Sequence, residues 1–220
     1  MSLALDHLVV AARTLEEGAR WLEARLGVPT AAGGRHALMG THNRLLALDG
    51  GAYLEIIAID PGAPAPSRAR WFGLDDPAMA RRLATGPALV HWVARTDDIE
   101  AARAHHPGLV GEVLALSRGD YRWRIGVPPD GSLPAAGVFP TLIHWEGDRH
   151  PAAALPPSGC RLHRLTLRSP EARRLQSALR DLGLPEGGPA GLVEAEAAGI
   201  SAEIRSPRGV VLLPESAVGE

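Results

Sequence analysis

Lysine is absent from this 220-residue sequence, and all of its basic residues are arginine. A chain without lysine has neither a Schiff-base lysine nor a P-loop lysine, so both chemistries are excluded. Cysteine occurs once, at Cys160, which excludes an intrachain disulfide and a cysteine-rich metal site. An isolated cysteine is more often a small buried apolar residue than a nucleophile, and we interpret Cys160 in that way.

Long apolar runs and an excess of charge are also missing. No stretch approaches the roughly 20 apolar residues of a membrane span, and no secretory leader is recognisable. The formal net charge of −2 gives no field that would gather nucleic acid or anionic lipid. Hydrophobic residues make up 45% of the chain, which is enough for a sizeable core. We therefore expect a cytoplasmic protein with no nucleic-acid or membrane partner.

A strand followed by a helix occurs three times, and each of these strands carries a histidine. The strands lie at residues 5–10 (LDHLVV), 90–93 (VHWV) and 162–165 (LHRL). Repeats fix the architecture, so they are considered before single motifs. Each copy predicts the order β-α-β-β-β. The predicted divisions are a first module at 1–60, a connector at 61–87, a second module at 88–148, a linker at 149–159 and a third module at 160–220.

Local signals support this division. Thr14 followed by Glu17 forms a capping box for the first helix, and Gly27 ends that helix. Gly33 and Gly34 predict a turn, and a tight turn at residues 50–51 joins two strands. The strand at 52–59 has the strongest signal in the chain.

Glu55 stands out because it lies between apolar residues on that strand. A carboxylate in such a place must be paired, hydrogen-bonded, metal-bound or neutralised. If each module sets its first and last strands side by side, His7 neighbours Glu55 and His91 neighbours His144. Imidazoles and a carboxylate facing one another are the ligand set expected for Zn²⁺, Fe²⁺, Mn²⁺ or Ni²⁺ with open positions.

A structural reading of the histidines stands beside the metal reading. A lone strand histidine is usually a satisfied core or surface residue, and His163 in the third copy has no partner, so the histidine can equally be a packing feature of the repeat. Two further features suit substrate binding. Asn43 lies in a polar segment before a strand, and Arg122 and Arg124 share one face of a strand, where guanidinium groups bind carboxylates and phosphates. Five other histidines fall in predicted loops or helix ends and are assigned no ligand role: His36, His42, His105, His106 and His150.

The chain resembles the vicinal oxygen chelate superfamily, and within it the glyoxalase-like domain group. The resemblance covers most of residues 3–146 and rests on short stretches. These stretches are LDHLVV at 5–10, GGRH at 33–36, GTHN at 40–43, YLEII at 53–57 and RWR at 122–124.

That resemblance implies an α+β fold in which repeated βαβββ modules form a curved, partly closed mixed sheet around a cleft, with helices outside. It implies a divalent metal held by ligands from the first and last strands of each module, at His7, Glu55, His91 and His144. A ligand carboxylate would also act as the catalytic base. It would be Glu55, or, if the family's base is the residue at position 144, the imidazole of His144 would take that task. The chain departs from the group at position 144, where an acidic ligand is expected, and Glu146 lies two residues further on.

Three functions follow as alternatives. The first is a metal-dependent enzyme of lyase, isomerase or ring-cleavage type that acts on a small oxygenated substrate. The second is a metal-free small-molecule binding or resistance protein on the same fold. The third is a structural homodimer module, in which the third repeat pairs with a second copy.

Overall fold

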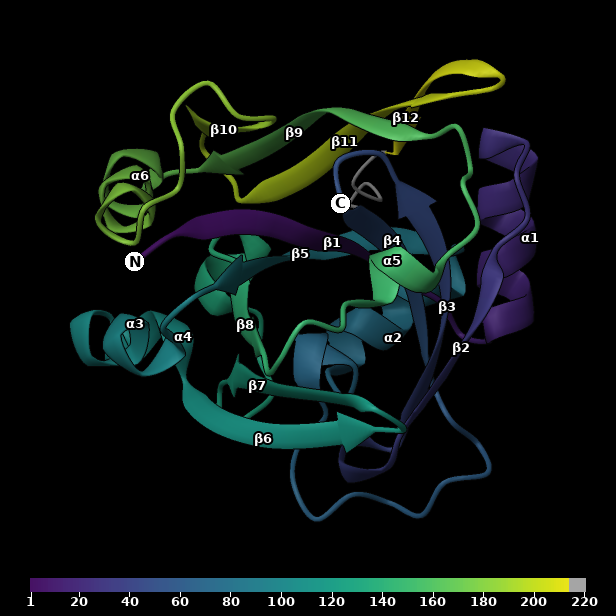
Figure 1. Ribbon diagram of the computed structural model, residues 1–220, viewed down its shortest axis with the longest axis horizontal. Coiled ribbons are helices and arrows are strands. Elements are labelled where there is room, and N and C mark those ends of the chain that lie inside the picture. The colour runs from purple at the N-terminus through teal and green to yellow at the C-terminus, as the bar shows by residue number, and fades with distance from the viewer. Residues whose placement is uncertain (214–220) are drawn as a thin grey trace.

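The computed structural model describes residues 1–213 and contains two β-sheets (Figure 1). The first module builds half of the larger sheet. Thr14 caps its helix by accepting a hydrogen bond from the backbone N–H of Glu17, and Gly27 closes the helix in the left-handed region at φ 75°. The elements of this module are β1 (Leu3–Ala11), α1 (Leu15–Leu26), β2 (Ala31–His36), η1 (Ala37–Met39), β3 (Thr41–Leu48) and β4 (Ala52–Ile59).

The second module builds the other half of the same sheet and is reached through a connector. The connector contains η2 (Trp71–Gly73) and α2 (Pro77–Ala84). The second module contains β5 (Ala88–Thr96), α3 (Ile99–His105), α4 (Pro107–Val110), β6 (Glu112–Arg118), β7 (Tyr121–Val127), η3 (Pro134–Gly137) and β8 (Thr141–Trp145). The strand order is β2-β3-β4-β1-β5-β8-β7-β6, so β1 and β5 form the antiparallel seam between the halves.

The third module has the element order that the sequence predicts but a different arrangement of strands. After α5 (Pro151–Ala154) come β9 (Arg161–Ser169), α6 (Ala172–Asp181), β10 (Ala190–Glu194), β11 (Gly199–Ser206) and β12 (Gly209–Leu213). Its sheet runs β10-β9-β11-β12, with β9 between β10 and β11, whereas the first strands of the other two modules pair with their own last strands, β4 and β8. The third module is therefore not a third copy of the cleft-forming half.

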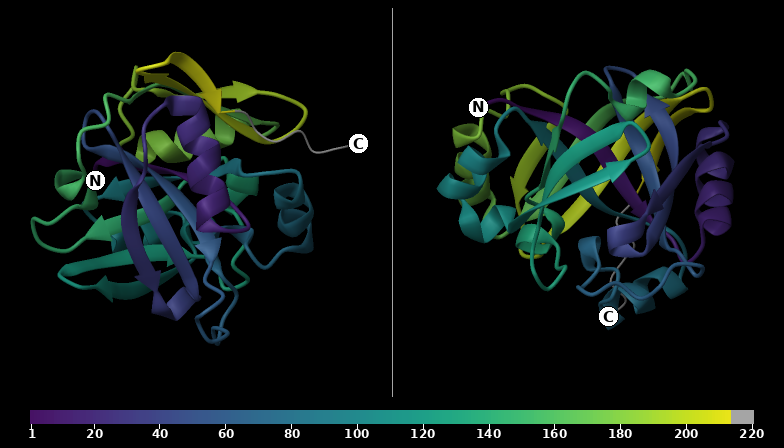
Figure 2. Two further views of the ribbon diagram at one scale, coloured as in Figure 1. Left: turned by 90° about the vertical axis from the view of Figure 1, so that its right-hand side faces the viewer. Right: turned by 60° about the horizontal axis from the view of Figure 1, so that its bottom comes forward.

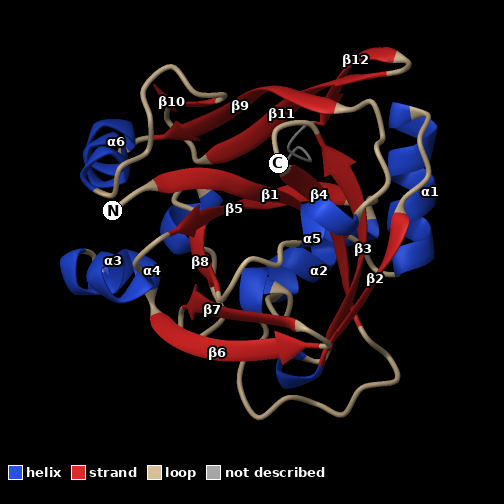
Figure 3. Ribbon diagram, viewed as in Figure 1, coloured by secondary structure: helices blue, strands red, loops and turns tan. Residues whose placement is uncertain are grey.

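The curved eight-stranded sheet separates two hydrophobic cores, one on its convex face and one on its concave face. One core lies between its convex face, the four-stranded sheet and helices α1, α3 and α6. Figure 1 and Figure 3 show the smaller sheet lying over the β1–β5 seam, with α1 and α3 on the outside of the curve. The other core fills the concave side and includes Trp71 and Phe72 of the connector. Figure 2 shows the curvature from two further directions. The predicted fold class is confirmed.

Several local predictions were wrong. His42 and Asn43 lie inside β3, and His36 is the last residue of β2. Gly33 and Gly34 do not form a turn but lie inside β2, where the pairing with β3 is irregular between Ala32 and Arg35. The reason is a close approach that no larger residue allows, because a Cβ on Gly33 would clash with the side chain of Asn43. Such proximity depends on tertiary packing, so local sequence could not show it.

Candidate active site

A small cavity of about 30 Å³ lies on the concave side of the eight-stranded sheet. This is room for one or two water molecules, or for a group of the size of a carboxylate, since a water needs roughly 10–15 Å³ measured in this way. Residues of both modules and of the connector line it. They are His7, His36, Asn43, Tyr53, Glu55, Trp71, Phe72, Arg118, Trp123, Ile125, Ile143 and Trp145.

A bulge in β1 sets His7 against Asp6. The β1–β5 register passes from Leu5 opposite Ala94 to His7 opposite Val93, so Asp6 is an extra residue. A bulge re-aims side chains. Here the carboxylate of Asp6 lies 2.6 Å from Nδ1 of His7, the next residue. His7 Nδ1–H therefore donates to Asp6, and its Nε2 is left to face the cavity side.

Asp6 is fully buried and is held by two further donors. Trp145 Nε1–H donates to Asp6 Oδ2 at 2.9 Å, and His150 Nε2 lies 2.9 Å from the same oxygen. His150 Nδ1 accepts the backbone N–H of Ala152, which leaves Nε2 as the protonated nitrogen that donates to Asp6. Burial alone would raise the pKa of Asp6, but the hydrogen bonds from His150 and His7 lower it far below its usual value, so Asp6 is ionised.

Glu55 completes a row of three charged groups. The parallel pairing of β1 with β4 puts Tyr53 opposite His7, and Glu55 follows two residues along on the same face. Glu55 Oε2 lies 3.4 Å from His7 Nε2, and Glu55 Oε1 accepts a 2.6 Å hydrogen bond from Asn43 Nδ2. Glu55 and His7 are 5% and 4% exposed, so the pair lies almost out of contact with water.

These contacts set the protonation of the pair. Burial alone would lower the pKa of His7, but its hydrogen bonds to Asp6 and Glu55 raise that pKa to about 9. Burial alone would raise the pKa of Glu55, but the hydrogen bond and charge of His7 lower it to about 2. At neutral pH the site is an imidazolium between two carboxylates.

Arg118 and His36 form the opposite side of the cavity. Arg118 Nη1 donates to Asn43 Oδ1 and to His36 Nε2, both at 3.2 Å. His36 Nδ1 lies 3.1 Å from Thr41 Oγ1 and therefore carries the proton of the neutral ring. Burial lowers the pKa of His36 to about 4, so the ring stays neutral. Gly34 leaves room for this contact, because a Cβ there would lie 2.5 Å from Arg118 Cδ.

The second module repeats this geometry with one change. Its bulge falls at Val90, next to His91, as the first falls at Asp6, next to His7. On β4 the partner of Val9 is Glu55, and on β8 the partner of Val93 is Thr141. Val9 and Val93 each lie two residues after their histidine, so Thr141 occupies the place of Glu55. The second half-site has a hydroxyl where the first has a carboxylate.

Both ring nitrogens of His91 are engaged in this half-site. Nε2 accepts the backbone N–H of Thr141 at 3.0 Å and lies 3.0 Å from its Oγ1, while Nδ1 lies 3.2 Å from the carbonyl oxygen of Gly137. Burial lowers the pKa of His91 to about 3, so this ring is neutral. Phe72 packs against it, with the ring centroids 5.6 Å apart.

The expected pairing of His91 with His144 is not formed. Ile143 and Trp145 line the cavity on the concave side, so His144 between them is on the other face of β8, where its Nδ1 lies 3.0 Å from the carbonyl oxygen of Thr96. Arg122 and Arg124 likewise lie on the outer face of β7. Arg122 is exposed, and Arg124 lies 3.6 Å from Glu100 and 3.7 Å from Glu146.

The structure thus brings His7, Glu55 and Asn43 together but not the whole predicted set. A four-ligand metal centre at His7, Glu55, His91 and His144 does not fit, because His91 is engaged at both nitrogens and His144 faces away. Within residues 1–213 no group of three or more histidine, cysteine, aspartate or glutamate side chains is arranged to hold a metal ion.

Several site residues were not predicted from the sequence. They are Asp6, His36, Tyr53, Trp71, Arg118, Trp145 and His150. One signal could have found Arg118. Arg118 is opposite Tyr121 in the β6–β7 hairpin, and Tyr121 points to the same face of β7 as Trp123 and Ile125. Because apolar residues mark the buried face of β7, Arg118 on the same face is expected to point inward.

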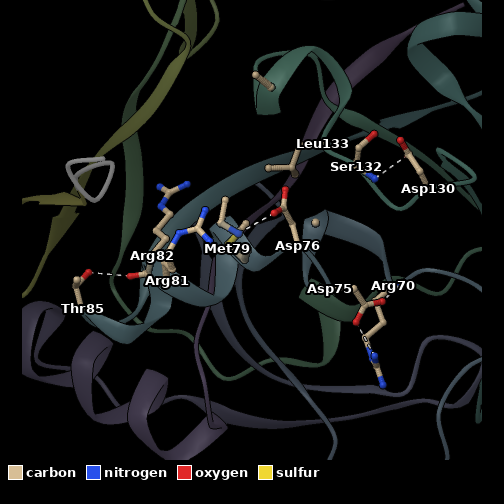
Figure 4. A pocket seen from close by; sticks show the side chains of 13 residues that line it. Arg70, Asp75, Asp76, Met79, Arg81, Arg82, Thr85, Asp130, Ser132 and Leu133 are labelled. Atoms are coloured by element: carbon tan, nitrogen blue, oxygen red, sulfur yellow. Dashed lines mark hydrogen bonds and ion pairs between the residues drawn. The ribbon is translucent and has the colours of Figure 1, made fainter. Parts of the chain in front are cut away.

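A wider groove of about 990 Å³ beside α2 is a weaker candidate (Figure 4). Most of its charged groups already have local partners. Arg70 pairs with Asp75 at 2.6 Å, Asp76 caps α2, and Asp130 accepts the N–H of Ser132. The groove therefore offers no converging set of reactive groups, in contrast to the buried row at His7. No helix within residues 1–213 has the length and apolar character needed to cross a membrane.

Comparisons with known proteins agree with this fold. No curated protein matches the chain. A hypothetical protein from Staphylococcus aureus is similar in structure, with a TM-score of 0.62 and 14% identity over 91% of this chain and 90% of that one. Methylmalonyl-CoA epimerase from Mycobacterium tuberculosis has a TM-score of 0.42 and 21% identity over 69% and 91% of the two chains. The glyoxalase-like domain model matches residues 5–183, and the chain therefore belongs to the glyoxalase-like domain family.

Proposed function

We propose that the protein is an enzyme that moves a proton on a small oxygenated substrate, with Glu55 as the catalytic base. One observation carries the proposal. Glu55 is a buried carboxylate at the cavity wall that is kept ionised by His7 and Asn43. A buried ionised group is costly to maintain, and perturbed groups of this kind gather at functional sites.

The three charged groups have separate tasks in this proposal. Glu55 accepts a proton from a carbon next to a carbonyl group. His7 donates its Nε2–H to the substrate oxygen on which negative charge develops, and Asp6 keeps the imidazolium in place. When His7 turns its hydrogen bond from Glu55 to the substrate, Glu55 loses a stabilising partner and its pKa rises, which makes it a stronger base. Return of the proton to the same or to the neighbouring carbon gives an isomerase type of reaction.

The family's divalent metal has no part in these steps. Only His7 and Glu55 of the predicted ligands reach the cavity, and the equivalent of Glu55 in the second module is Thr141. The proposed chemistry therefore uses the side chains of this chain alone.

Hydrogen–deuterium exchange at carbon tests the proposal without knowledge of the product. Small oxo acids and hydroxy acids are incubated with the protein in D₂O, and loss of C–H signals is followed by NMR. We expect exchange at a carbon next to a carbonyl, slowed about 10²–10⁴-fold in Glu55→Gln because a general base contributes that much. Glu146→Gln is the matched control, since Glu146 is exposed. Exchange that is equal in wild type and Glu55→Gln would exclude Glu55 as the base, and ligand binding without any exchange would favour a binding protein.

A further inference from the structure

Two hydrogen-bond donors at the cavity are not matched by an acceptor or counter-charge. Trp71 is 4% exposed, and its Nε1–H is buried without a hydrogen-bond partner. Buried indole N–H groups normally find a partner. Trp71 belongs to the cavity wall. Its N–H has almost no accessible surface in this structure, so an acceptor on a ligand reaches it only when the indole ring shifts as the ligand enters.

Arg118 is the second donor. It is half-buried, and the acceptors of its Nη1 are the neutral groups Asn43 and His36. Among the ion pairs found within residues 1–213, none joins Arg118 to a carboxylate, although the other cation at the cavity, His7, has two. A guanidinium that is partly removed from water favours an anion with two oxygens.

The two donors lie on the same side of the cavity. Both residues contact the ring of His36: its centroid is 5.0 Å from that of the Trp71 ring, and its Nε2 is 3.2 Å from Arg118 Nη1. His36 is neutral and therefore adds no charge to this side. Glu55, whose charge would repel an anion, is offset by His7 and by the amide of Asn43.

We infer that Arg118 and Trp71 form a subsite for the carboxylate of the substrate. The guanidinium of Arg118 and the indole N–H of Trp71 hold its oxygens, inside the cavity that Glu55 and His7 also line. The cavity volume of about 30 Å³ suits a group of this size. That the bound carboxylate belongs to a substrate rests on the proposed function. The substrate is then a small carboxylic acid.

The indole N–H signals of the five tryptophans provide a direct test. Protein labelled with ¹⁵N at the indole is titrated with acetate or glycolate, against sodium chloride at equal ionic strength, and Trp71 is assigned with Trp71→Phe. We expect a saturable downfield shift of the Trp71 signal. Trp92 is an internal control, because its Nε1–H already donates to the carbonyl oxygen of Val138 at 2.9 Å and should not move.

Charge-matched variants decide whether Arg118 takes part. Arg118→Gln should weaken acetate binding at least tenfold, whereas Arg122→Gln, which removes the same charge on the outer face of β7, should leave it unchanged. A Trp71 signal that does not move, or that moves equally in Arg118→Gln, overturns the subsite. Acetate binding and carbon exchange together separate the two proposals. If Glu55→Gln still binds acetate but the wild-type protein shows no carbon exchange, the subsite is supported and the proposed base is rejected. If the wild-type protein shows carbon exchange that Glu55→Gln slows, but acetate does not bind, only the subsite is rejected.

Discussion

Thr141 occupies in the second module the place that Glu55 holds in the first. Each lies on the last strand of its module, opposite a valine that follows the module's histidine by two residues. Thr141 Oγ1 is 3.0 Å from His91 Nε2, and Glu55 Oε2 is 3.4 Å from His7 Nε2. The exchange of a carboxylate for a hydroxyl makes one half-site charged and the other neutral, which is why a symmetric four-ligand centre does not form.

His7→Ala should destabilise the protein far more than His163→Ala. Without His7, Asp6 and Glu55 lose the cation between them, and breaking a buried ion pair costs about 3–5 kcal/mol. His163 is exposed on β9, so its removal should change the free energy of unfolding by less than about 0.5 kcal/mol. Urea denaturation of both variants measures this difference. Equal effects would mean that His7 is an ordinary packing residue of the repeat.

Stability should be greatest near pH 6.5 and fall on both sides. As the pH rises from 6.5 toward about 9, the unfolded chain loses a histidine proton that His7 keeps in the folded state, so the free energy of unfolding falls by a few kcal/mol. As the pH falls from 6.5 toward about 4, His36 and His91 become protonated in the unfolded chain but stay neutral in the folded protein, so the free energy of unfolding falls again. Denaturant midpoints across this range measure both limbs. Constant stability between pH 7 and pH 9 would show that His7 is not held as an imidazolium.

Added Co²⁺ should bind weakly, and only through His7 and Glu55. Binding must displace the Nε2 proton of His7, so the affinity should rise about tenfold per pH unit below the pKa of about 9. His7→Ala should abolish binding, and His91→Gln should leave it within about twofold, since both His91 nitrogens are engaged elsewhere. Isothermal titration calorimetry gives these affinities. Equal losses in the two variants would indicate a centre that recruits His91 when metal is present.

Periodicity and capping were enough to predict the repeated elements, since these depend on local signals such as Thr14 and Gly27. The assumption that the first and last strands of a module lie side by side correctly predicted the contact between His7 and Glu55. It did not lead to the second pair correctly, because the bulge at Val90 and the parallel register of β5 with β8 decide that Thr141, and not His144, contacts His91. Register between distant strands is set by tertiary packing.

The remaining site residues show the same limit. The arginine of the site is Arg118, because the alternation of β7 turns Arg122 and Arg124 outward and Trp123 inward. Trp71 comes from the connector, whose sequence has no periodic pattern that would place it over the cavity. The strand order of the third module also depends on how β9 packs, which its own sequence does not specify.

The account depends most on the charged contact between His7 and Glu55, and the titration of the His7 imidazole by NMR measures it directly. We expect a pKa of about 9 in the wild-type protein and a clearly lower value in Glu55→Gln, where one of the two flanking charges is removed. A wild-type value near 6.5 that does not change in Glu55→Gln would contradict the central claim.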